Sequence, residues 1–559
     1  MALPRQRRTK PVNAAAMVRE GQLHLAAGRA DKARSMAEMA VKRQPELAAA
    51  WHLLALAAEA LSDNSAALDA YQQAMSLAPD QPNIGVDLAR LAMSLDLFAV
   101  AERLLQTCRQ QDPGSINIIN SLALAQASQM NLPAAIATLT TALEAHPTEP
   151  ILWNTLGLIL FSDGRMDEAA TFLGEALRLD PSMGQARIAL ADALMSTAGF
   201  DKEKQNVALI EGQGSIADAP PPLRATARVA QAKRLFVAGR LAEGWQAYEA
   251  RHDLSYEDAT AFPLPYPQWH AGSAIEGHHL LLIGEQGLGD EILFAQTVPD
   301  ILTALGPKGR LTLALDPRLR TLGARSFPTA QIVPHTTGRA KGRGLRGIET
   351  AFDRGQAPDL WAPLGTAMAA LRPDAASFGG AAPFLKPDPE RVIYWRNWLT
   401  SLGGGRKVGI LWKSLLVDLN RARYFAPLSA WEPILTTPGV QFISLQYGRA
   451  EDDLRAIAEQ MGVQVAVPPS LDQKDELEGV AALCAALDLT IGPATATTNL
   501  AAASGSAVLV YMPPASWPLF GTDHYPSYPR VKVQLLSRFG AWDEAMAAIA
   551  EALNEFSGP

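Results

Sequence analysis

The chain is 559 residues long and carries a formal net charge of −8, with 48% hydrophobic and 19% charged residues. A chain of this length exceeds what one hydrophobic core supports, so two or three domains are expected. The composition is that of a globular protein, and the acidic balance argues against a general nucleic-acid binder. The two cysteines, Cys108 and Cys484, lie far apart in the sequence, which excludes a disulfide framework and a cysteine-only zinc site.

The chain starts with a basic segment, MALPRQRRTK, that is not followed by an apolar signal segment. No stretch of the sequence is apolar over the length of a membrane span. We therefore expect a cytoplasmic protein without a membrane span.

A proline recurs at intervals of 34 residues at five positions: Pro45, Pro79, Pro113, Pro147 and Pro181. This period is typical of the tetratricopeptide repeat, a helix–turn–helix unit that stacks on its neighbours to form a superhelix. Proline is expected where the second helix of a unit ends, and small residues where its two helices approach closely. The pattern predicts an all-α repeat domain over residues 12–200, with a surface suited to holding a polypeptide.

The helical pattern is interrupted after residue 200. The segment 199–223 contains glycines, acidic residues and the run Pro220–Pro222, which indicate a break between helices. One more helical hairpin is predicted over residues 223–252 as a degenerate repeat. We expect residues 201–277 to form this hairpin and a connector.

From residue 278 onward the pattern changes to short apolar runs that are typical of buried strands. These runs are HHLLLIG (278–284), RLTLAL (310–315), VGILW (408–412), VQFISL (440–445) and AVLVYM (507–512). Helical stretches separate several of them, which favours an α/β region with largely parallel sheets. The stretch Phe378–Asp388 is expected to join two lobes, 278–385 and 386–559, and residues 541–556 are expected to form a closing amphipathic helix.

The first candidate site is the turn after the run at 278–284. Gly287 and Gly289 permit a close approach of the backbone to a ligand, and Asp290 is expected at the start of the next helix. Its carboxylate can cap that helix or accept a proton from a substrate hydroxyl, and the residues alone favour the cap. The glycine spacing matches neither a dinucleotide fingerprint nor a Walker loop, so it leaves the chemistry open.

The second candidate site is the segment LDLTIGPATATTNLAAASG (487–505). A strand is expected to end at Gly492, and a helix follows whose first turn carries Thr495, Thr497, Thr498 and Asn499. Backbone N–H groups, hydroxyls and the positive end of the helix dipole suit a phosphate. The alternative is that the threonines only cap a helix whose alanines pack tightly on a sheet, and the segment alone favours neither.

A third stretch places cations beyond the end of a predicted strand. Lys413 follows the run at 408–412, and Arg421 and Arg423 lie in the loop after it. Three such cations can pair with a diphosphate or a carboxylate, although solvated loop charges are the commoner case.

Together these segments resemble bacterial tetratricopeptide-repeat glycosyltransferases, which are related to the O-GlcNAc transferases and, in the C-terminal half, to lipopolysaccharide heptosyltransferases. The matching stretches cover essentially all of residues 225–545: LFVAGRLAEGWQAYEAR, PYPQWHAG, LLLIGEQGLGDEILFA, VGILWKS, VQFISLQYG, LDLTIGPATATTNLAAASG and MPPASWPLFGTDHYPSYPRV. The resemblance implies a glycosyltransferase-B fold, in which two Rossmann-like lobes face each other across a cleft. The C-terminal lobe would hold the nucleotide-sugar and the N-terminal lobe would face the acceptor.

The resemblance also implies roles for the candidate residues. Asp290 matches the acidic residue taken as the base that deprotonates the acceptor, and Lys413 matches the basic residue that neutralises the leaving phosphate. The implied donor-binding set comprises Gly287, Gly289, Arg421, Arg423, Gln446, Thr495, Thr497, Thr498 and Asn499. No metal site and no cofactor besides the nucleotide-sugar are expected, because lysine, arginine and a helix dipole can stabilise the leaving group. Ala494 and Asn499 depart from the heptosyltransferase pattern, which weakens the transfer of that donor specificity.

Chains of this two-part form are similar to alphaproteobacterial flagellin glycosyltransferases. That resemblance implies that the repeats hold flagellin, and that the catalytic half transfers a nonulosonic acid such as pseudaminic acid from its CMP-activated form to serine or threonine. Arg421 and Arg423 suit a donor that carries a carboxylate as well as a phosphate. Two alternatives stay open: an interaction scaffold that has lost catalysis, and an envelope-polysaccharide glycosyltransferase.

Overall fold

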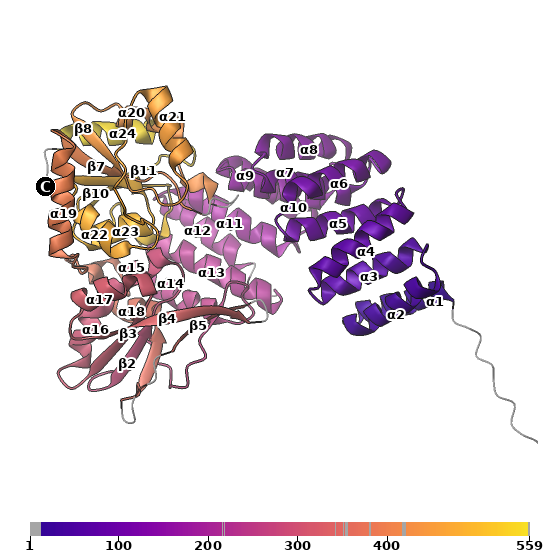
Figure 1. Cartoon of the computed structure of the whole chain (residues 1–559), viewed down its shortest axis with the longest axis horizontal. Coiled ribbons are helices and arrows are strands. Elements are labelled where there is room, and N and C mark those ends of the chain that lie inside the picture. Colours follow the sequence, from indigo (N-terminus) through magenta and orange to yellow (C-terminus); the bar gives the residue numbers. More distant parts are fainter. Residues whose placement is uncertain are drawn as a thin grey trace, which may run out of the picture. The chain divides into compact units, whose positions relative to one another are not determined.

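A computed structural model describes residues 13–214, 216, 219–340, 343–349, 352, 356–379, 382–415 and 421–556 (Figure 1). The basic start of the chain, residues 1–10, lies outside these ranges. Residue contacts separate two compact units, Met1–Ile159 and Leu160–Pro559. None of the helices in the described ranges combines the length and the apolar character that crossing a membrane requires.

The first unit consists of antiparallel helix pairs. Its helices are α1 (Ala14–Ala26), α2 (Ala30–Arg43), α3 (Ala48–Ala60), α4 (Asn64–Leu77), α5 (Pro82–Ser94), α6 (Phe98–Gln111), α7 (Ile116–Ser128), α8 (Leu132–Ala145) and most of α9 (Pro150–Ser162). Each periodic proline of this unit stands two residues after the second helix of a pair, as predicted. The indole N–H of Trp51 donates to the carbonyl of Pro45 at 2.7 Å, and Trp153 repeats this bond with Pro147 at 2.8 Å.

The close approach of paired helices depends on alanine at one position of the repeat. Five alanines at the 34-residue interval are completely buried: Ala33, Ala67, Ala101, Ala135 and Ala169. A larger side chain there would force the helices of a pair apart, because packed interiors tolerate added volume poorly. The repeat is therefore defined by packing as well as by the proline after each pair.

The second unit begins with five more helices. These are α10 (Met166–Leu179), α11 (Gly184–Ala198), α12 (Lys202–Gln213), α13 (Pro221–Val237) and α14 (Leu241–Tyr248). The last two form the predicted degenerate hairpin. Since the division falls after Ile159, the final repeat helices group with the α/β part rather than with the repeats before them.

Helix α12 corrects the break that we expected directly after residue 200. The carboxylate of Asp201 accepts from the N–H groups of Glu203 and Lys204 at 3.0 and 3.2 Å and so caps the helix. Ala208 and Leu209 are buried, and α12 packs against α11. The polar and glycine-containing sequence of this segment indicated a break, but burial against α11 stabilises a helix there. The break before α13 therefore begins only after Gln213.

The first α/β lobe is built on a six-stranded sheet. Its strands are β1 (Thr260–Ala261), β2 (His279–Ile283), β3 (Arg310–Leu315), β4 (Gln331–Ala340), β5 (Arg343–Ile348) and β6 (Leu360–Pro363), in the order β1-β5-β4-β3-β2-β6. All neighbours are parallel except β4 and β5. The helices are α15 (Leu288–Phe294), α16 (Val298–Leu305), α17 (Arg320–Ser326) and α18 (Leu364–Leu371).

The second lobe has a fully parallel sheet of five strands. These are β7 (Arg406–Ile410), β8 (Val440–Ser444), β9 (Leu489–Pro493), β10 (Val508–Met512) and β11 (Val531–Leu535), in the order β11-β10-β9-β7-β8. The helices are α19 (Pro389–Ser401), α20 (Glu432–Leu435), α21 (Glu451–Met461), α22 (Leu477–Ala486), α23 (Ala496–Ala503) and α24 (Trp542–Glu555). The predicted α/β class, largely parallel sheets and closing helix are confirmed.

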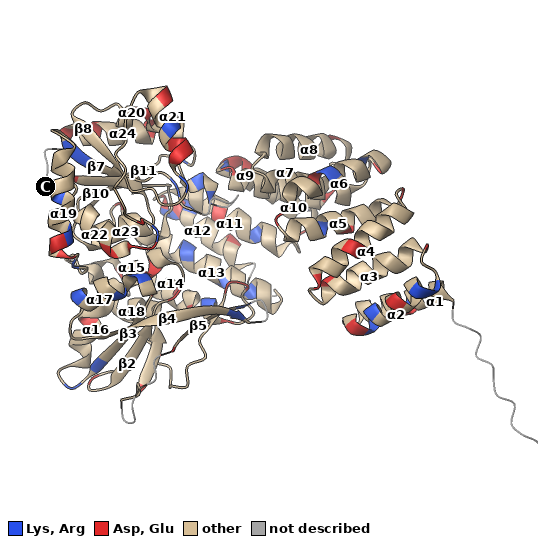
Figure 2. Ribbon diagram, viewed as in Figure 1, with Lys and Arg blue, Asp and Glu red and all other residues tan. Residues whose placement is uncertain are grey.

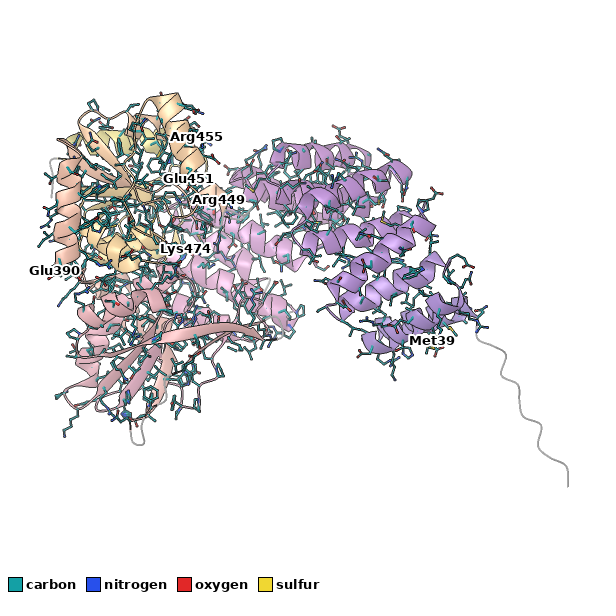
Figure 3. All side chains as sticks on the ribbon, in the orientation of Figure 1. Met39, Glu390, Arg449, Glu451, Arg455 and Lys474 are labelled. Atoms are coloured by element: carbon teal, nitrogen blue, oxygen red, sulfur yellow. The ribbon has the colours of Figure 1, made fainter. Side chains whose placement is uncertain are left out.

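Charged side chains lie mainly on the helices and loops, whereas the strands of both sheets carry few of them (Figure 2). The exposed residues Glu390, Glu451 and Arg455, for example, lie on the outer helices α19 and α21 (Figure 3).

The connector between the lobes packs on the second lobe, because the N–H groups of Phe384 and Leu385 donate to the carbonyl of Ala503.

Each sheet reverses its strand order once, and this reversal predicts where a ligand binds. In the first lobe, β2 lies between β3 and β6; in the second lobe, β7 lies between β8 and β9. Ligands of doubly wound sheets bind beyond the carboxyl ends of the strands at such a reversal. The turn that leads to Asp290 follows β2, and Lys413 and Ala494 follow β7 and β9. Helix α15 packs against α23, so the two reversal points adjoin.

Candidate functional site

Asp290 lies in the first turn of α15, where its carboxylate accepts a hydrogen bond from the N–H of Gly287 at 3.3 Å. The helix cap predicted for this residue is therefore confirmed. The half-buried side chain also lines a cavity of about 120 Å³. Lys233 of α13, Tyr248 of α14 and Trp517 of the second lobe line the same cavity. The carboxylate is thus placed both to cap its helix and to meet a ligand.

The surroundings of Asp290 alter its acidity. Burial raises the pKa of Asp290 to about 6, against the opposing effects of the Gly287 N–H group and the positive charge of Lys233. A carboxylate with a pKa near neutrality accepts a proton more readily than an exposed aspartate does. With this pKa the carboxylate is largely ionised at pH 7 and can accept a proton there.

A buried ion pair fixes the turn that carries Asp290. Glu285 is 1% exposed and accepts from Nε and Nη2 of Arg251 at 2.8 and 3.0 Å, and from the N–H of Gly365 at 2.7 Å. Burial opposes ionisation, but the charge and hydrogen bonds of Arg251 outweigh it and hold the pKa of Glu285 below its usual value. The pair connects the helical hairpin to β2 and β6 at the reversal point.

The start of α23 combines a helix cap with a threonine that lines a cavity. The N–H of Thr495 donates to Oγ1 of Thr498 at 2.8 Å, and that hydroxyl donates to the carbonyl of Pro493 at 2.8 Å. Thr498 is therefore occupied by capping, as one of the two interpretations predicted. Thr497 lines a cavity of about 370 Å³, and its hydroxyl makes no hydrogen bond to the residues that the structure describes.

The cavity beside Thr497 lies at the reversal point of the second lobe. Ser414 after β7 and Ala494 after β9 both line it, together with Gly289 of the first lobe. Three cationic side chains in the described ranges also contribute to its wall: Arg318, Lys474 and Arg421. Backbone N–H groups at a helix start and cations from two lobes suit an anionic ligand.

The two threonines permit a matched prediction. Thr497→Val should weaken the binding of a phosphate-bearing ligand about three- to tenfold with little change in melting temperature, because one hydroxyl hydrogen bond is worth about 1 kcal/mol. Thr498→Val should instead lower the free energy of unfolding by about 1 kcal/mol through loss of the cap. Ligand titration and thermal melting of both variants measure this difference, and identical behaviour of the two would contradict the assignment.

Lys413 lies shortly after the end of β7, and its ammonium group forms an ion pair with the carboxylate of Asp453 on α21. The same carboxylate accepts from the indole N–H of Trp412 at 2.8 Å. Oε1 of Gln446 accepts from the N–H groups of Trp412 and Lys413 at 3.1 and 3.0 Å, and its Nε2 donates to the carbonyl of Lys413 at 2.9 Å. Gln446 therefore shapes this turn through the backbone, and Ser414 rather than Lys413 lines the cavity.

Asn499 and Gly289 meet at the contact between the lobes. The amide of Asn499 donates to the carbonyl of Gly289 at 3.0 Å and accepts from the hydroxyl of Tyr525 at 3.1 Å. A Cβ atom at position 289 would lie 3.4 Å from the backbone nitrogen of Ala496. The close approach that Gly289 permits is thus between α15 and α23, and the amide of Asn499 is engaged in the same contact.

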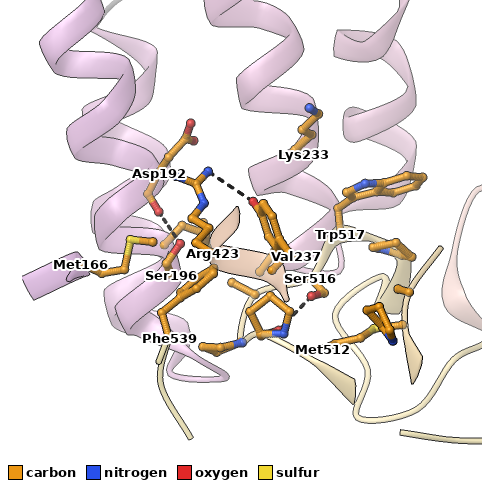
Figure 4. Close-up of a pocket in the computed structure, with 18 of the residues that line it drawn as sticks. Met166, Asp192, Ser196, Lys233, Val237, Arg423, Met512, Ser516, Trp517 and Phe539 are labelled. Atoms are coloured by element: carbon orange, nitrogen blue, oxygen red, sulfur yellow. Dashed lines mark hydrogen bonds between the residues drawn. The ribbon is translucent and has the colours of Figure 1, made fainter. Parts of the chain in front are cut away.

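A third and larger cavity, of about 450 Å³, lies within the second unit between helices α10, α11 and α13 and the loops of the second lobe (Figure 4). Arg421 and Arg423 both line it. Arg423 donates to the carbonyl of Phe161 at 3.0 Å and lies over the ring of Phe161 at 4.2 Å, so it attaches its loop to the end of α9. Arg421 lines both this cavity and the one beside Thr497.

Known proteins resemble the chain over both of its parts. Models of the tetratricopeptide repeat match residues 18–82, 58–118 and 120–184, which confirms the predicted repeats. Protein FlbA of Caulobacter vibrioides is 38% identical over 530 residues, covering 94% of this chain and 87% of FlbA. The chain belongs to the FlbA family. A TPR repeat-containing protein of Pseudomonas aeruginosa is 26% identical over 170 residues, covering 30% of this chain and 28% of that protein.

Solved structures resemble parts of this FlbA-family chain. A thermophilic TPR protein of Thermus thermophilus is 23% identical with a TM-score of 0.28, covering 32% of this chain and 98% of its own. YrrB, a TPR protein with an unusual peptide-binding site, is 14% identical with a TM-score of 0.27, covering 31% of this chain and 90% of its own.

The structure of this FlbA-family member adds residues that sequence reasoning missed. They are Lys233 and Arg251 from the helical hairpin, Glu285 after β2, and Asp453 on α21. The sign that the sequence offered for Glu285 was a glutamate two residues after the end of a buried strand. Nothing in the local sequence indicated the others, because each acts on a partner that is distant along the chain. Among the residues that the structure describes, no three metal-ligating side chains lie together.

Proposed function

We propose that this FlbA-family protein is a protein O-glycosyltransferase with a glycosyltransferase-B catalytic half. It transfers a nonulosonic acid from a CMP-activated donor to serine or threonine of a polypeptide held by the repeats, with flagellin as the expected acceptor. The observation that carries this proposal is the position of Asp290. Its carboxylate, with a pKa of about 6, lies in a cavity at the reversal point of one lobe, next to the reversal point of the other.

The proposed reaction follows from this arrangement. Asp290 accepts the proton of the acceptor hydroxyl, and the hydroxyl oxygen forms a bond to the anomeric carbon of the sugar. The bond between that carbon and the phosphate oxygen breaks, and its electron pair leaves with CMP. The N–H groups at the start of α23 and the charge of Arg421 stabilise the phosphate as it leaves.

The repeats supply the reason for a protein acceptor. Stacked helical hairpins form an extended concave surface, which suits an extended or helical polypeptide rather than a small molecule. Recognition by the repeats and chemistry in the lobes would then act on one acceptor.

Lys413→Ala should lower turnover about tenfold and leave donor affinity nearly unchanged. Lys413 pairs with Asp453 and lies outside the wall of the cavity beside Thr497, so it acts on the leaving phosphate as a neighbouring charge rather than by direct contact. A factor of ten in rate corresponds to about 1.4 kcal/mol. Steady-state kinetics with titrated donor measure both quantities. A tenfold loss of donor affinity with unchanged turnover would instead assign Lys413 to donor binding alone.

The scaffold alternative is supported by the ion pair of Lys413 with Asp453 and by the hydrogen bond of the Asn499 amide to Gly289. Both interactions occupy polar groups that would otherwise be available to a ligand. Mass spectrometry of flagellin separates the two functions. Cells with the intact gene, a deletion and an Asp290→Asn allele are compared. The proposed function predicts that deletion and the allele both lose the sugar mass, whereas a scaffold predicts that the allele keeps it.

A further inference from the structure

The charged side chains that line the cavity of about 450 Å³ are mainly positive, whereas the chain as a whole is negatively charged. Five charged side chains among the described residues line it: Lys233, Arg234, Arg421, Arg423 and Asp192. The carboxylate of Asp192 pairs with the buried guanidinium of Arg234, so it is compensated inside the wall. Of the other three, Lys233 and Arg423 add positive charge to the wall, in a chain whose formal net charge is −8, whereas Arg421 is engaged in an interaction of its own. A cavity with excess positive charge favours an anionic occupant.

Lys233 occupies a particular place in this charge distribution. Lys233 is itself exposed, on α13 beside the buried residues Val229, Phe236 and Val237. It lines both the cavity of Asp290 and the larger cavity. The structure gives it no ion pair with any residue in the described ranges. Figure 4 shows Lys233 on its helix next to Trp517.

The rest of the wall defines the kind of anion. Aromatic and other apolar side chains predominate there, including Phe161, Met166, Met195, Val237, Trp517 and Phe539. A small inorganic ion would leave these surfaces without contact. An organic anion with an apolar face and one or more charged groups would fill the cavity, as an acidic sugar attached to a nucleotide does.

We propose that Lys233 binds an anionic group of the substrate, either the carboxylate of an acidic sugar or the phosphate that links the sugar to the nucleotide. A residue of the helical hairpin thereby completes the site of the α/β lobes. This inference rests on the proposed function and names a residue that binds the anionic part of its donor. Lys233 comes from the helical part and Arg421 from the second lobe, and both line the same cavity.

The test uses the full-length chain with Lys233→Met, which keeps the apolar stem and removes the charge. Isothermal titration calorimetry compares the binding of CMP and of CMP-N-acetylneuraminic acid. Loss of a charged hydrogen-bonded contact should weaken the binding of CMP-N-acetylneuraminic acid about tenfold or more. Unchanged affinity for CMP would assign Lys233 to the sugar carboxylate, and an equal loss for CMP would assign it to the phosphate.

Two further variants serve as controls. Lys233→Arg keeps a cation and should restore most of the affinity, whereas Arg228→Met removes an exposed charge of α13 outside both cavities and should change nothing. Unchanged affinity of Lys233→Met for both ligands would overturn the inference while leaving the proposed function intact. A wild-type protein that binds neither ligand would contradict the proposed donor, and the inference would fail with it.

Discussion

Asp290→Asn should lower the rate of acceptor glycosylation by about 100-fold or more, because general-base catalysis commonly contributes that much and an amide cannot take the proton. The substitution keeps the size of the side chain and an oxygen that can accept from Gly287, so the loss of helix capping should cost about 1 kcal/mol at most. Transfer by purified wild-type and variant protein measures the first effect, and thermal melting measures the second.

Asp543→Asn is the matched control, since Asp543 also lies in the first turn of a helix but lines none of the three cavities. It should keep full activity. A folded and fully active Asp290→Asn protein would leave Asp290 as a helix cap and remove it from the mechanism.

The raised pKa of Asp290 adds a pH dependence to this prediction. The base acts only when ionised, so the catalytic efficiency of the wild type should rise with pH up to about 6 and then level off. The folded pKa lies above the unfolded value of about 3.9, so the native state holds more protons in between. The contribution of Asp290 to the free energy of unfolding therefore decreases as pH rises through that window.

Glu285→Ala should have the largest effect on stability, a loss of about 3–5 kcal/mol in the free energy of unfolding. The substitution leaves the guanidinium of Arg251 buried without its main counter-charge, and it removes the acceptor for the N–H of Gly365. The turn before Asp290 loses its support at the same time. Chemical denaturation of the full chain measures the loss for the second unit.

Glu249→Ala provides a direct comparison, because Glu249 also pairs with Arg251, at 3.0 Å, but its side chain is 46% exposed. Exposed ion pairs contribute less than about 1 kcal/mol, so this variant should remain close to the wild type. Equal losses from the two substitutions would show that burial of Glu285 does not determine its contribution.

The sequence predicted the elements whose local pattern and tertiary role agree. Helices end just before Pro45 and its periodic equivalents, as the sequence predicted. Strand β3 coincides with the predicted run RLTLAL, because all of its residues except the first are buried. Helix α12 was missed because burial of Ala208 and Leu209 against α11 outweighs its polar sequence. The β4–β5 hairpin was missed because its glycines and arginines lack the apolar alternation of a strand.

The candidate site was predictable in position but less so in contacts. The places of Asp290, Lys413 and Thr497 follow from strand ends and helix starts, which local sequence reveals. That Asp453 takes the ammonium of Lys413 depends on how α21 packs, and forty residues separate the partners. Lys233 reaches the site only because the helical hairpin folds against the α/β lobes, a contact that no local pattern encodes.

Transfer of the sugar by the purified protein is the most direct test of the proposed glycosyltransferase activity. Full-length chain is incubated with flagellin and a CMP-activated nonulosonic acid, and the intact mass of flagellin is recorded by mass spectrometry. We expect an increase by one nonulosonic acid residue for each modified serine or threonine, and no increase with Asp290→Asn. A wild-type protein that binds both donor and flagellin and yet leaves the mass of flagellin unchanged would contradict it.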